Sequence, residues 1–282
     1  AALRAIATAG FTRTEISSQS PHISSPLHGK ELELFLDLLK ECGVRATTVH
    51  APMRENVLGA PEESWRSEKV GVIGDYLRFA ADISADSLVI HPVPNPIFVP
   101  DPERPELIEI IAAATRRSLD ELVPVALETG VRMLLENLPY HCQYPFLTMG
   151  GLRPLVDSYP EDAVGLVVDT GHAWTSGNDP AEEIRTAGSR LWGTHLQDVD
   201  GDDPQDNHWV PTHGGLDWTS IRNALHGVGY AGILTFEVIA ARHGEEPEEL
   251  ARLTKHVADG LGLGSIETSV LPTEQAREGM GS

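Results

Sequence analysis

The chain has 282 residues, 41% of them hydrophobic, which is enough to build the core of one large domain. Its formal charge of −21 disfavours DNA, RNA and anionic membranes as partners, because such surfaces require a concentrated basic face. The two cysteines, Cys42 and Cys142, are too few for a Cys-only metal site and predict no disulfide framework. No signal peptide and no apolar run of about 18 residues is visible, so we predict a cytoplasmic protein.

Short apolar runs alternate with helical stretches along most of the chain. The predicted strands are residues 14–17, 46–49, 87–90, 132–135, 164–168, 191–194 and 233–236. Most of these runs are continuously apolar, which is typical of parallel strands covered on both faces.

Helix signals fill the intervals between these runs. A helix is predicted over residues 30–42, because apolar positions recur at helical spacing and Gly43 follows. Another begins at Pro105, and Asp179 and Asp217 are expected N-caps for two further helices. This alternation of strand and helix predicts βαβ units with parallel strands.

We therefore predict an α/β fold of the TIM (β/α)8 type, as a single domain over residues 1–262 followed by a tail over residues 263–282. Only seven strands are visible, and the helical segment at residues 1–9 has none before it, so a first barrel strand is expected to be missing. An open doubly wound sheet is the alternative. It would call for a glycine-rich phosphate loop after an early strand, which this sequence lacks.

Six of the apolar runs end in a residue that can bind a metal. These are His50, His91, Glu136, Asp169, His195 and Glu237. The carboxyl ends of barrel strands converge on one mouth, where clustered charges would be poorly solvated unless a divalent cation neutralised them. Mixed imidazole and carboxylate ligands favour Mn, Zn, Co or Fe over Mg.

Three residues that follow strand ends extend this set. His172 lies three positions after Asp169, and Asp206 and His208 are two positions apart, so on an extended segment both point the same way. They are further candidate ligands, for one metal ion or for more than one. The alternative for Asp206 and His208 is a solvated acidic loop.

The motifs LLENLP, VVDTGHA, GTHLQD and DNHWVPTHGGLDW, with FEV on the last strand, resemble the xylose isomerase-like TIM barrels over roughly residues 1–260. That group includes sugar phosphate isomerase/epimerase proteins and endonuclease IV-type apurinic endonucleases. The resemblance implies that Glu136, Asp169, His195 and Glu237 bind a catalytic divalent metal, and all nine ligand positions of the endonuclease branch are also filled. Thr212 stands where glycine is usual.

The first functional hypothesis is a metal-dependent isomerase or epimerase acting on a sugar, a sugar phosphate or a related polyol. Glu136 and Glu237 would transfer the proton through a metal-stabilised enediolate, and His172, Trp174 and His91 would bind substrate. The alternatives are a multinuclear zinc phosphoesterase acting on a small substrate and a non-catalytic ligand-binding barrel. The expected partner is a small molecule, with no nucleic acid and no membrane, and a homo-oligomer is plausible for the family.

Overall fold

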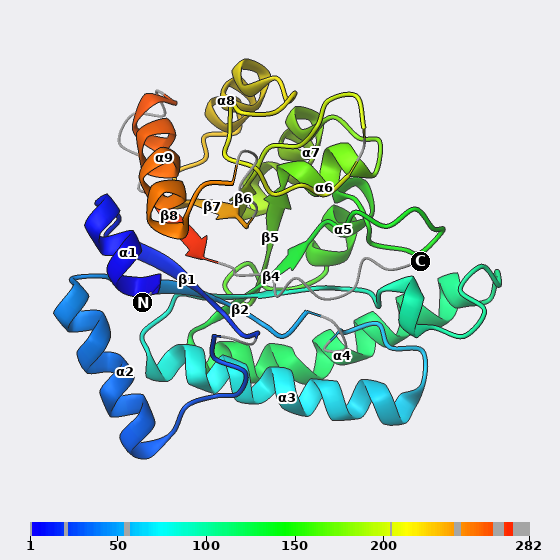
Figure 1. Ribbon diagram of the computed structural model, residues 1–282. Coiled ribbons are helices and arrows are strands. Elements are labelled where there is room, and N and C mark those ends of the chain that lie inside the picture. The colour runs from blue at the N-terminus through cyan, green and yellow to red at the C-terminus, as the bar shows by residue number, and fades with distance from the viewer. Residues whose placement is uncertain are drawn as a thin grey trace.

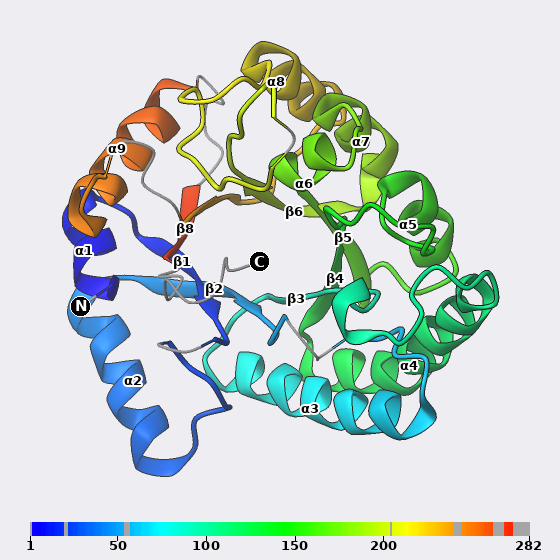
Figure 2. The same cartoon turned by 45° about the vertical axis from the view of Figure 1, so that its right-hand side comes forward.

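Eight parallel strands close into a barrel in the computed structural model, which describes residues 2–19, 22–53, 57–203, 205–239, 244–261 and 268–272. The strands pair in sequence order, and Figure 2 shows them as a ring inside a layer of helices. They are β1 Arg13–Ser17, β2 Arg45–His50, β3 Ser87–Ile90, β4 Arg132–Glu136, β5 Val164–Asp169, β6 Leu191–Leu196, β7 Leu234–Val238 and β8 Thr268–Pro272.

The helices lie around this ring (Figure 1). They are α1 Ala2–Ala9, α2 Gly29–Cys42, α3 Glu63–Asp82, α4 Leu107–Thr129, α5 Met149–Val156, α6 Thr170–Thr175, α7 Pro180–Ala187, α8 Trp218–Gly227 and α9 Pro247–Gly260, with 3-10 turns η1 Pro96–Phe98 and η2 Gly188–Arg190. The predicted caps are confirmed. The Asp179 side chain accepts from the backbone N–H of Ala181, Asp217 caps α8, and α2 ends at Gly43 in the left-handed conformation with φ 65°.

Each of the seven predicted strands is present, and their apolar character has the expected cause. All six residues of β5 are buried, since helices cover its outer face and other strands face its inner side. The main core lies between sheet and helices. A small second cluster, Val89, Leu134 and Val167, lies apart from it.

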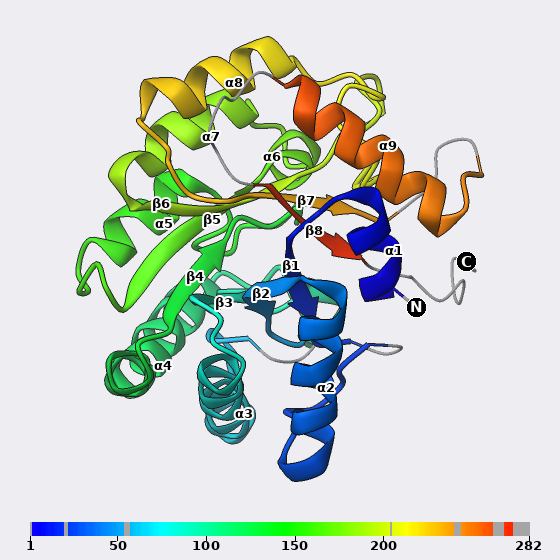
Figure 3. The ribbon, with the colours of Figure 1, turned by 90° about the vertical axis from the view of Figure 1, so that its left-hand side faces the viewer.

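The closure of the barrel corrects one expectation. Ahead of β1 the described residues form the helix α1, and the position beside β1 is taken by β8, which comes from the segment predicted to be a tail. β8 pairs in parallel with both β7 and β1 (Figure 3). The ring is therefore complete. The strand was missed because its sequence, TSVLP, has only two consecutive apolar residues before a proline.

The parallel order places the carboxyl ends of all strands on one rim, and the register aligns the candidate ligands there. Asp169 on β5 is paired with His195 on β6, and Glu136 is the last residue of β4. Within the described ranges, no helix has the length and apolar character needed to cross a membrane.

Candidate metal centre

Four side chains from consecutive strand ends meet at the carboxyl rim of the barrel. Glu136, Asp169, His195 and Glu237 are all buried, and their ligand-type atoms lie within 4.8 Å of one another. Two atoms bound to one ion at about 2.0–2.2 Å lie no more than about 4.4 Å apart, so small side-chain movements would let all four contact one cation. We call these residues the four-residue group. The structure brings them together as expected, and their role as ligands stays a prediction.

Two histidines, one at the end of β2 and one directly after β3, also contact Glu136. The Nε2 atoms of His50 and His91 are 3.3 Å and 3.2 Å from Glu136 Oε2, and the two rings meet edge to face with centroids 5.4 Å apart. His50, Glu136 and His195 form a second set of atoms close enough to share an ion. Glu136 thus faces both sets, so its two oxygens are available to different cations.

A third set combines His172 of α6 with two residues of the long β6–α8 loop. Asp206 Oδ2 is 3.3 Å from His172 Nε2 and 3.0 Å from His208 Nε2. We call His172, Asp206 and His208 the loop triad. The carboxylate is 30% exposed, whereas both imidazoles are nearly buried, so this set lies at the solvent side of the centre. The prediction that Asp206 and His208 converge therefore agrees with the structure.

Backbone carbonyls orient three of these imidazoles. The Nδ1 atom of His50 lies 2.8 Å from Ala51 O, that of His172 lies 2.9 Å from Asn137 O, and that of His208 lies 3.2 Å from Glu237 O. A carbonyl can only accept, so each contact fixes the proton on Nδ1. Nε2 then faces the carboxylates, and it offers a lone pair to a cation once its own proton is lost.

His195 is oriented by a carboxylate that the sequence did not assign to the centre. Its Nδ1 lies 2.8 Å from Glu136 Oε1 and 3.1 Å from Glu237 Oε2, while Nε2 lies 3.1 Å from Glu15 Oε1. Glu15 is in β1 and is 1% exposed. Its position at the carboxyl half of a barrel strand was a usable signal, because the mouth collects residues from every strand.

Two buried amides were also missed. Asn137 directly follows Glu136, and its side chain donates to Asp169 O and accepts from Asp169 N at 2.9 Å and 2.8 Å. Gln197 follows His195 by two residues and contacts Asp169, Asp206 and His208. An amide within two residues of a strand-end ligand is the pattern that could have identified both.

Charge and burial oppose each other throughout the centre. Burial disfavours the charged form of Glu136, but the neighbouring His195, His50 and His91 outweigh it and hold the pKa of Glu136 well below its usual range. For Asp169, burial prevails, aided by Glu237 and Glu136, and raises the pKa to about 7. A bound cation would favour the ionised form of Asp169 in the same way that it removes repulsion among the other carboxylates.

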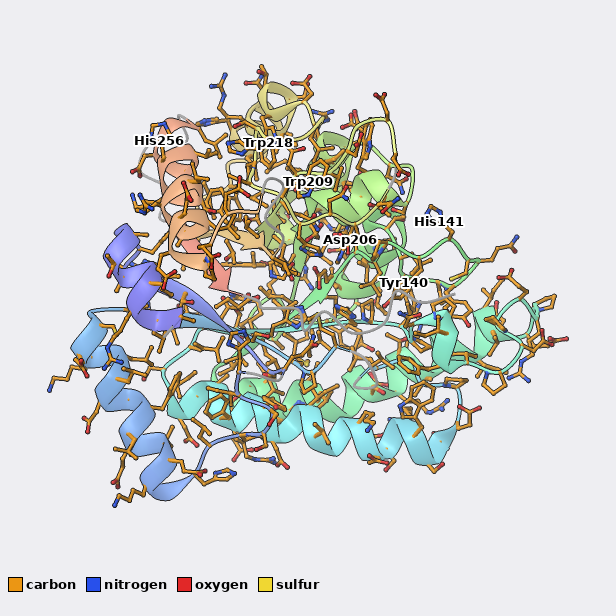
Figure 4. All side chains as sticks on the ribbon, viewed as in Figure 1. Tyr140, His141, Asp206, Trp209, Trp218 and His256 are labelled. Atoms are coloured by element: carbon orange, nitrogen blue, oxygen red, sulfur yellow. The ribbon has the colours of Figure 1, made fainter. Side chains whose placement is uncertain are left out.

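The loop triad and the residues around it show the same competition. Burial alone would lower the pKa of His208, but Asp206 and Glu237 outweigh it and raise the value to about 9. Burial, followed by Glu136 and Asp206, raises the pKa of Tyr140. Figure 4 shows Tyr140 and Asp206 on neighbouring loops at this end of the barrel. Tyr140 therefore lies in the field of the carboxylates as a neutral phenol.

Several buried atoms lack a hydrogen bond within the described part of the chain. They include both ring nitrogens of His91 and Oε2 of Glu237. Leaving such groups unsatisfied is costly, and a cation would satisfy one ring nitrogen of His91 and the Glu237 oxygen. The combination of imidazole and carboxylate donors fits Mn, Zn, Co or Fe better than Mg. The residues present thus fit a divalent transition metal.

Of the three residues expected to bind substrate, the structure places two among the candidate ligands. His91 and His172 both lie beside Glu136, at 3.2 Å and 3.4 Å. Trp174, on α6, is partly buried and packs against the hydrophobic core. A separate open cavity of about 400 Å³ is lined by Ser64, Trp65, Glu68 and Lys69 of α3 and by Phe98 of η1, and it includes none of the candidate ligands.

The β6–α8 loop carries backbone strain next to its ligands. His208 has φ 52° and Thr212 has φ 71°, both in the left-handed region that favours glycine. Thr212 is the position where the resemblance leads us to expect glycine, and this φ supplies the physical reason. The loop is anchored by Asp198, whose carboxylate accepts from Val199 N, Leu216 N and Trp218 Nε1.

Fold and site together define a TIM barrel with a buried imidazole and carboxylate centre at its carboxyl rim. The family model for the xylose isomerase-like TIM barrel matches residues 3–257, and the chain belongs to this family.

Relatives of this chain include proteins that are named for two different activities. The chain is 26% identical over 250 residues to the uncharacterized protein MJ1311 of Methanocaldococcus jannaschii, covering 88% of this chain and 81% of that one. It is 26% identical to D-psicose 3-epimerase of Ruminiclostridium cellulolyticum (82% and 75% covered) and 23% identical to a probable endonuclease 4 of Thermoplasma acidophilum (67% and 63% covered). A D-psicose 3-epimerase structure solved in the presence of D-fructose superposes with TM-score 0.77, 18% identity and 93% coverage of both chains.

Proposed function

We propose that this protein is a metal-dependent isomerase or epimerase that moves a proton on a carbon next to a carbonyl group in a sugar, a sugar phosphate or a related polyol. The observation that carries the proposal is the four-residue group, in which Glu136 and Glu237 approach one imidazole, His195, from two different strands. The epimerases among the relatives and the similar structures support the same reaction class.

The two carboxylates could transfer the proton in turn. The pKa of Glu237 falls to about 2, because His195 and His208 outweigh the effect of burial, so this group is ionised at neutral pH and can accept a proton from carbon. The pKa of Glu136 is lowered as well, so this group, from β4, would have to take up a proton before returning one to the other face of that carbon. A divalent cation held by the four-residue group supplies positive charge that stabilises the negative charge developing on the substrate oxygens.

The surrounding residues prepare this step. Burial of the carboxylates excludes water, which strengthens their interactions with substrate. Asn137 and Glu15 hold Asp169 and His195 in position, and His172 can donate a hydrogen bond to a substrate oxygen once its Nε2 is protonated. The neutral Tyr140 phenol offers a further donor at the rim.

Exchange of substrate hydrogen with solvent tests the proposal. The metal-loaded protein is incubated in D2O with ketohexoses, their phosphates and keto-inositols, and deuterium at the carbon beside the carbonyl is measured by NMR. We expect incorporation with at least one class, and loss of incorporation in Glu136→Gln and Glu237→Gln but not in Glu31→Gln, whose side chain is exposed on α2. Failure of the wild-type protein to exchange hydrogen in any of these compounds would contradict the proposal.

A second candidate function rests on the loop triad. Eight of the nine candidate ligands, all except His91, fall into three sets, which is more than a single-metal isomerase needs. Several cations at one mouth suit the hydrolysis of a phosphoester, and the probable endonuclease 4 among the relatives supports that class. The charge of −21 favours a small phosphorylated substrate over DNA.

Isotope transfer separates the two functions. Hydrolysis in H2 18O places 18O in the released phosphate and leaves carbon-bound hydrogen unchanged, whereas isomerisation does the opposite. Metal content adds a second criterion: activity that is complete with one ion per chain favours the isomerase, and activity that requires three favours the hydrolase.

A further inference from the structure

The Gln197 side chain lies between the four-residue group and the loop triad. It follows the end of β6 and is fully buried. Its backbone is fixed by Thr170, whose hydroxyl donates to Gln197 O at 2.7 Å and accepts from Gln197 N at 3.0 Å. Gly171 lies directly against the side-chain amide, and a Cβ at that position would overlap it.

The Gln197 amide contacts both sets of candidate ligands at once. Its Nε2 donates to Asp169 of the four-residue group, at 3.1 Å and 3.2 Å from the two oxygens, and to Asp206 Oδ1 of the loop triad at 2.8 Å. Its Oε1 accepts from the backbone N–H of His208 at 2.8 Å. A primary amide has two N–H groups and a carbonyl with two lone pairs, so these contacts use both of its donors and one of its acceptor positions.

Only one orientation of this amide is compatible with its neighbours. If nitrogen and oxygen were exchanged, the carbonyl would face two carboxylates and the NH2 would face an N–H donor. The observed orientation also leaves Asp206 Oδ2, the oxygen nearest both imidazoles, free of Gln197. Gln197 therefore holds one oxygen of Asp206 and leaves the other for a cation.

The same contact supports a strained backbone. His208 has φ 52°, a conformation that costs a non-glycine residue free energy and persists only where surrounding contacts impose it. Three contacts do so: His208 N to Gln197 Oε1, His208 Nδ1 to Glu237 O, and Ile239 N to His208 O. The first two are made by side chains, those of Gln197 and of His208 itself, and the first can be removed without replacing His208.

We propose that Gln197 is a positioning residue that sets the loop triad against the four-residue group, so that the triad binds a divalent cation tightly only when this amide is present. Residues that orient ligands without binding metal commonly change affinity by about 10–100-fold when they are replaced. The inference goes beyond the proposed function, because it holds whether the centre isomerises or hydrolyses its substrate.

Metal titration of the full-length metal-free protein tests this inference without any substrate. Co2+ binding is followed by its visible absorption, and bound metal is counted after gel filtration, for wild type, Gln197→Met and His208→Ala. Methionine keeps the length of glutamine but has no amide. The matched control is Gln205→Met, an exposed position in the same loop.

We expect Gln197→Met to lose about 10–100-fold in affinity for the cation at the loop triad, so that its titration matches that of His208→Ala. The four-residue group should keep its ion in both variants, and Gln205→Met should bind metal as the wild type does. Gln197→Asn, which keeps the amide but is one methylene too short to reach both carboxylates, should lie between wild type and Gln197→Met. Gln197→Asn replaces Gln197→Met as the test of the inference if circular dichroism shows that the methionine variant does not fold.

Binding curves of Gln197→Met, or of Gln197→Asn if methionine prevents folding, that match wild type would overturn the inference. An equal loss of metal from the loop triad and from the four-residue group would also overturn it, because the amide would then act on the centre as a whole. Neither result bears on the proposed reaction, which the deuterium exchange experiment tests separately.

Discussion

Asn137 joins the ends of β4 and β5 beyond their last paired residues, and removing its side chain should destabilise the fold and disturb the centre together. The β4–β5 ladder ends with Glu136 paired to Val167. The Asn137 amide then continues the pairing, since it donates to Asp169 O at 2.9 Å and accepts from Asp169 N at 2.8 Å. The side chain thus replaces a backbone partner at the residue that carries one of the candidate ligands.

The size of the effect follows from burial. Asn137 is 1% exposed and Asp169 is 0% exposed, so in Asn137→Ala the backbone N–H and C=O of Asp169 lose their partners in a region that water reaches poorly. Each unsatisfied buried group costs about 1–3 kcal/mol, and the two together give a loss of about 2–6 kcal/mol. For a chain of this size, that corresponds to a fall in Tm of roughly 3–10 °C.

Thermal unfolding by circular dichroism, with and without added Zn2+, measures both consequences. We expect Asn137→Ala to lower the Tm of the metal-free protein by the amount given above and to reduce the additional stabilisation that the metal provides. Asn223→Ala, at an exposed position of α8, is the matched control. The reasoning is refuted if Asn137→Ala unfolds at the same temperature as Asn223→Ala in both conditions.

Three further predictions address the site and its loop. Glu237→Gln should lower turnover by about 10²–10⁴-fold with an unchanged fold, and normal steady-state kinetics in that variant would remove Glu237 from the mechanism. Metal binding needs neutral imidazole, and the pKa of His208 is raised to about 9 and that of His172 well above its usual range. Calorimetric affinity at the loop triad should therefore fall by at least about tenfold per pH unit as pH drops below 9; a flat profile would contradict this. Thr212→Gly should raise the free energy of unfolding in urea by about 1 kcal/mol, because it relieves strain at φ 71°, and no gain would show that the strain is absent.

The barrel and its candidate ligands were accessible from the sequence because both are local signals. A buried parallel strand is a short apolar run, and a ligand at its carboxyl end is the polar residue that closes the run, as with Glu136 at the end of β4 and Asp169 at the end of β5. In a closed parallel barrel the strand ends meet at one mouth, so the ligands at these ends are expected to converge even when no distances are known. Asp206 and His208 were harder, since they belong to a loop whose path depends on its anchors.

The eighth strand was not accessible for the opposite reason. β8 is stabilised by pairing with β7 and β1, which are its neighbours in space, and its own sequence is too short and too polar to indicate a strand. Strand formation in such a segment depends on context more than on intrinsic preference. The predicted domain boundary at residue 262 therefore left out part of the sheet.

The residues that organise the centre were missed because their roles depend on distances between segments far apart in the chain. Asn137 is bonded to a residue 32 positions away, and Gln197 to one 28 positions away. Asp169 accepts hydrogen bonds from both amides. A histidine or carboxylate at a strand end can be read as a ligand from its side chain alone, whereas an amide gains its role only from the groups it separates or joins. The amides are therefore the residues most informative about whether the three sets of ligands act as one centre.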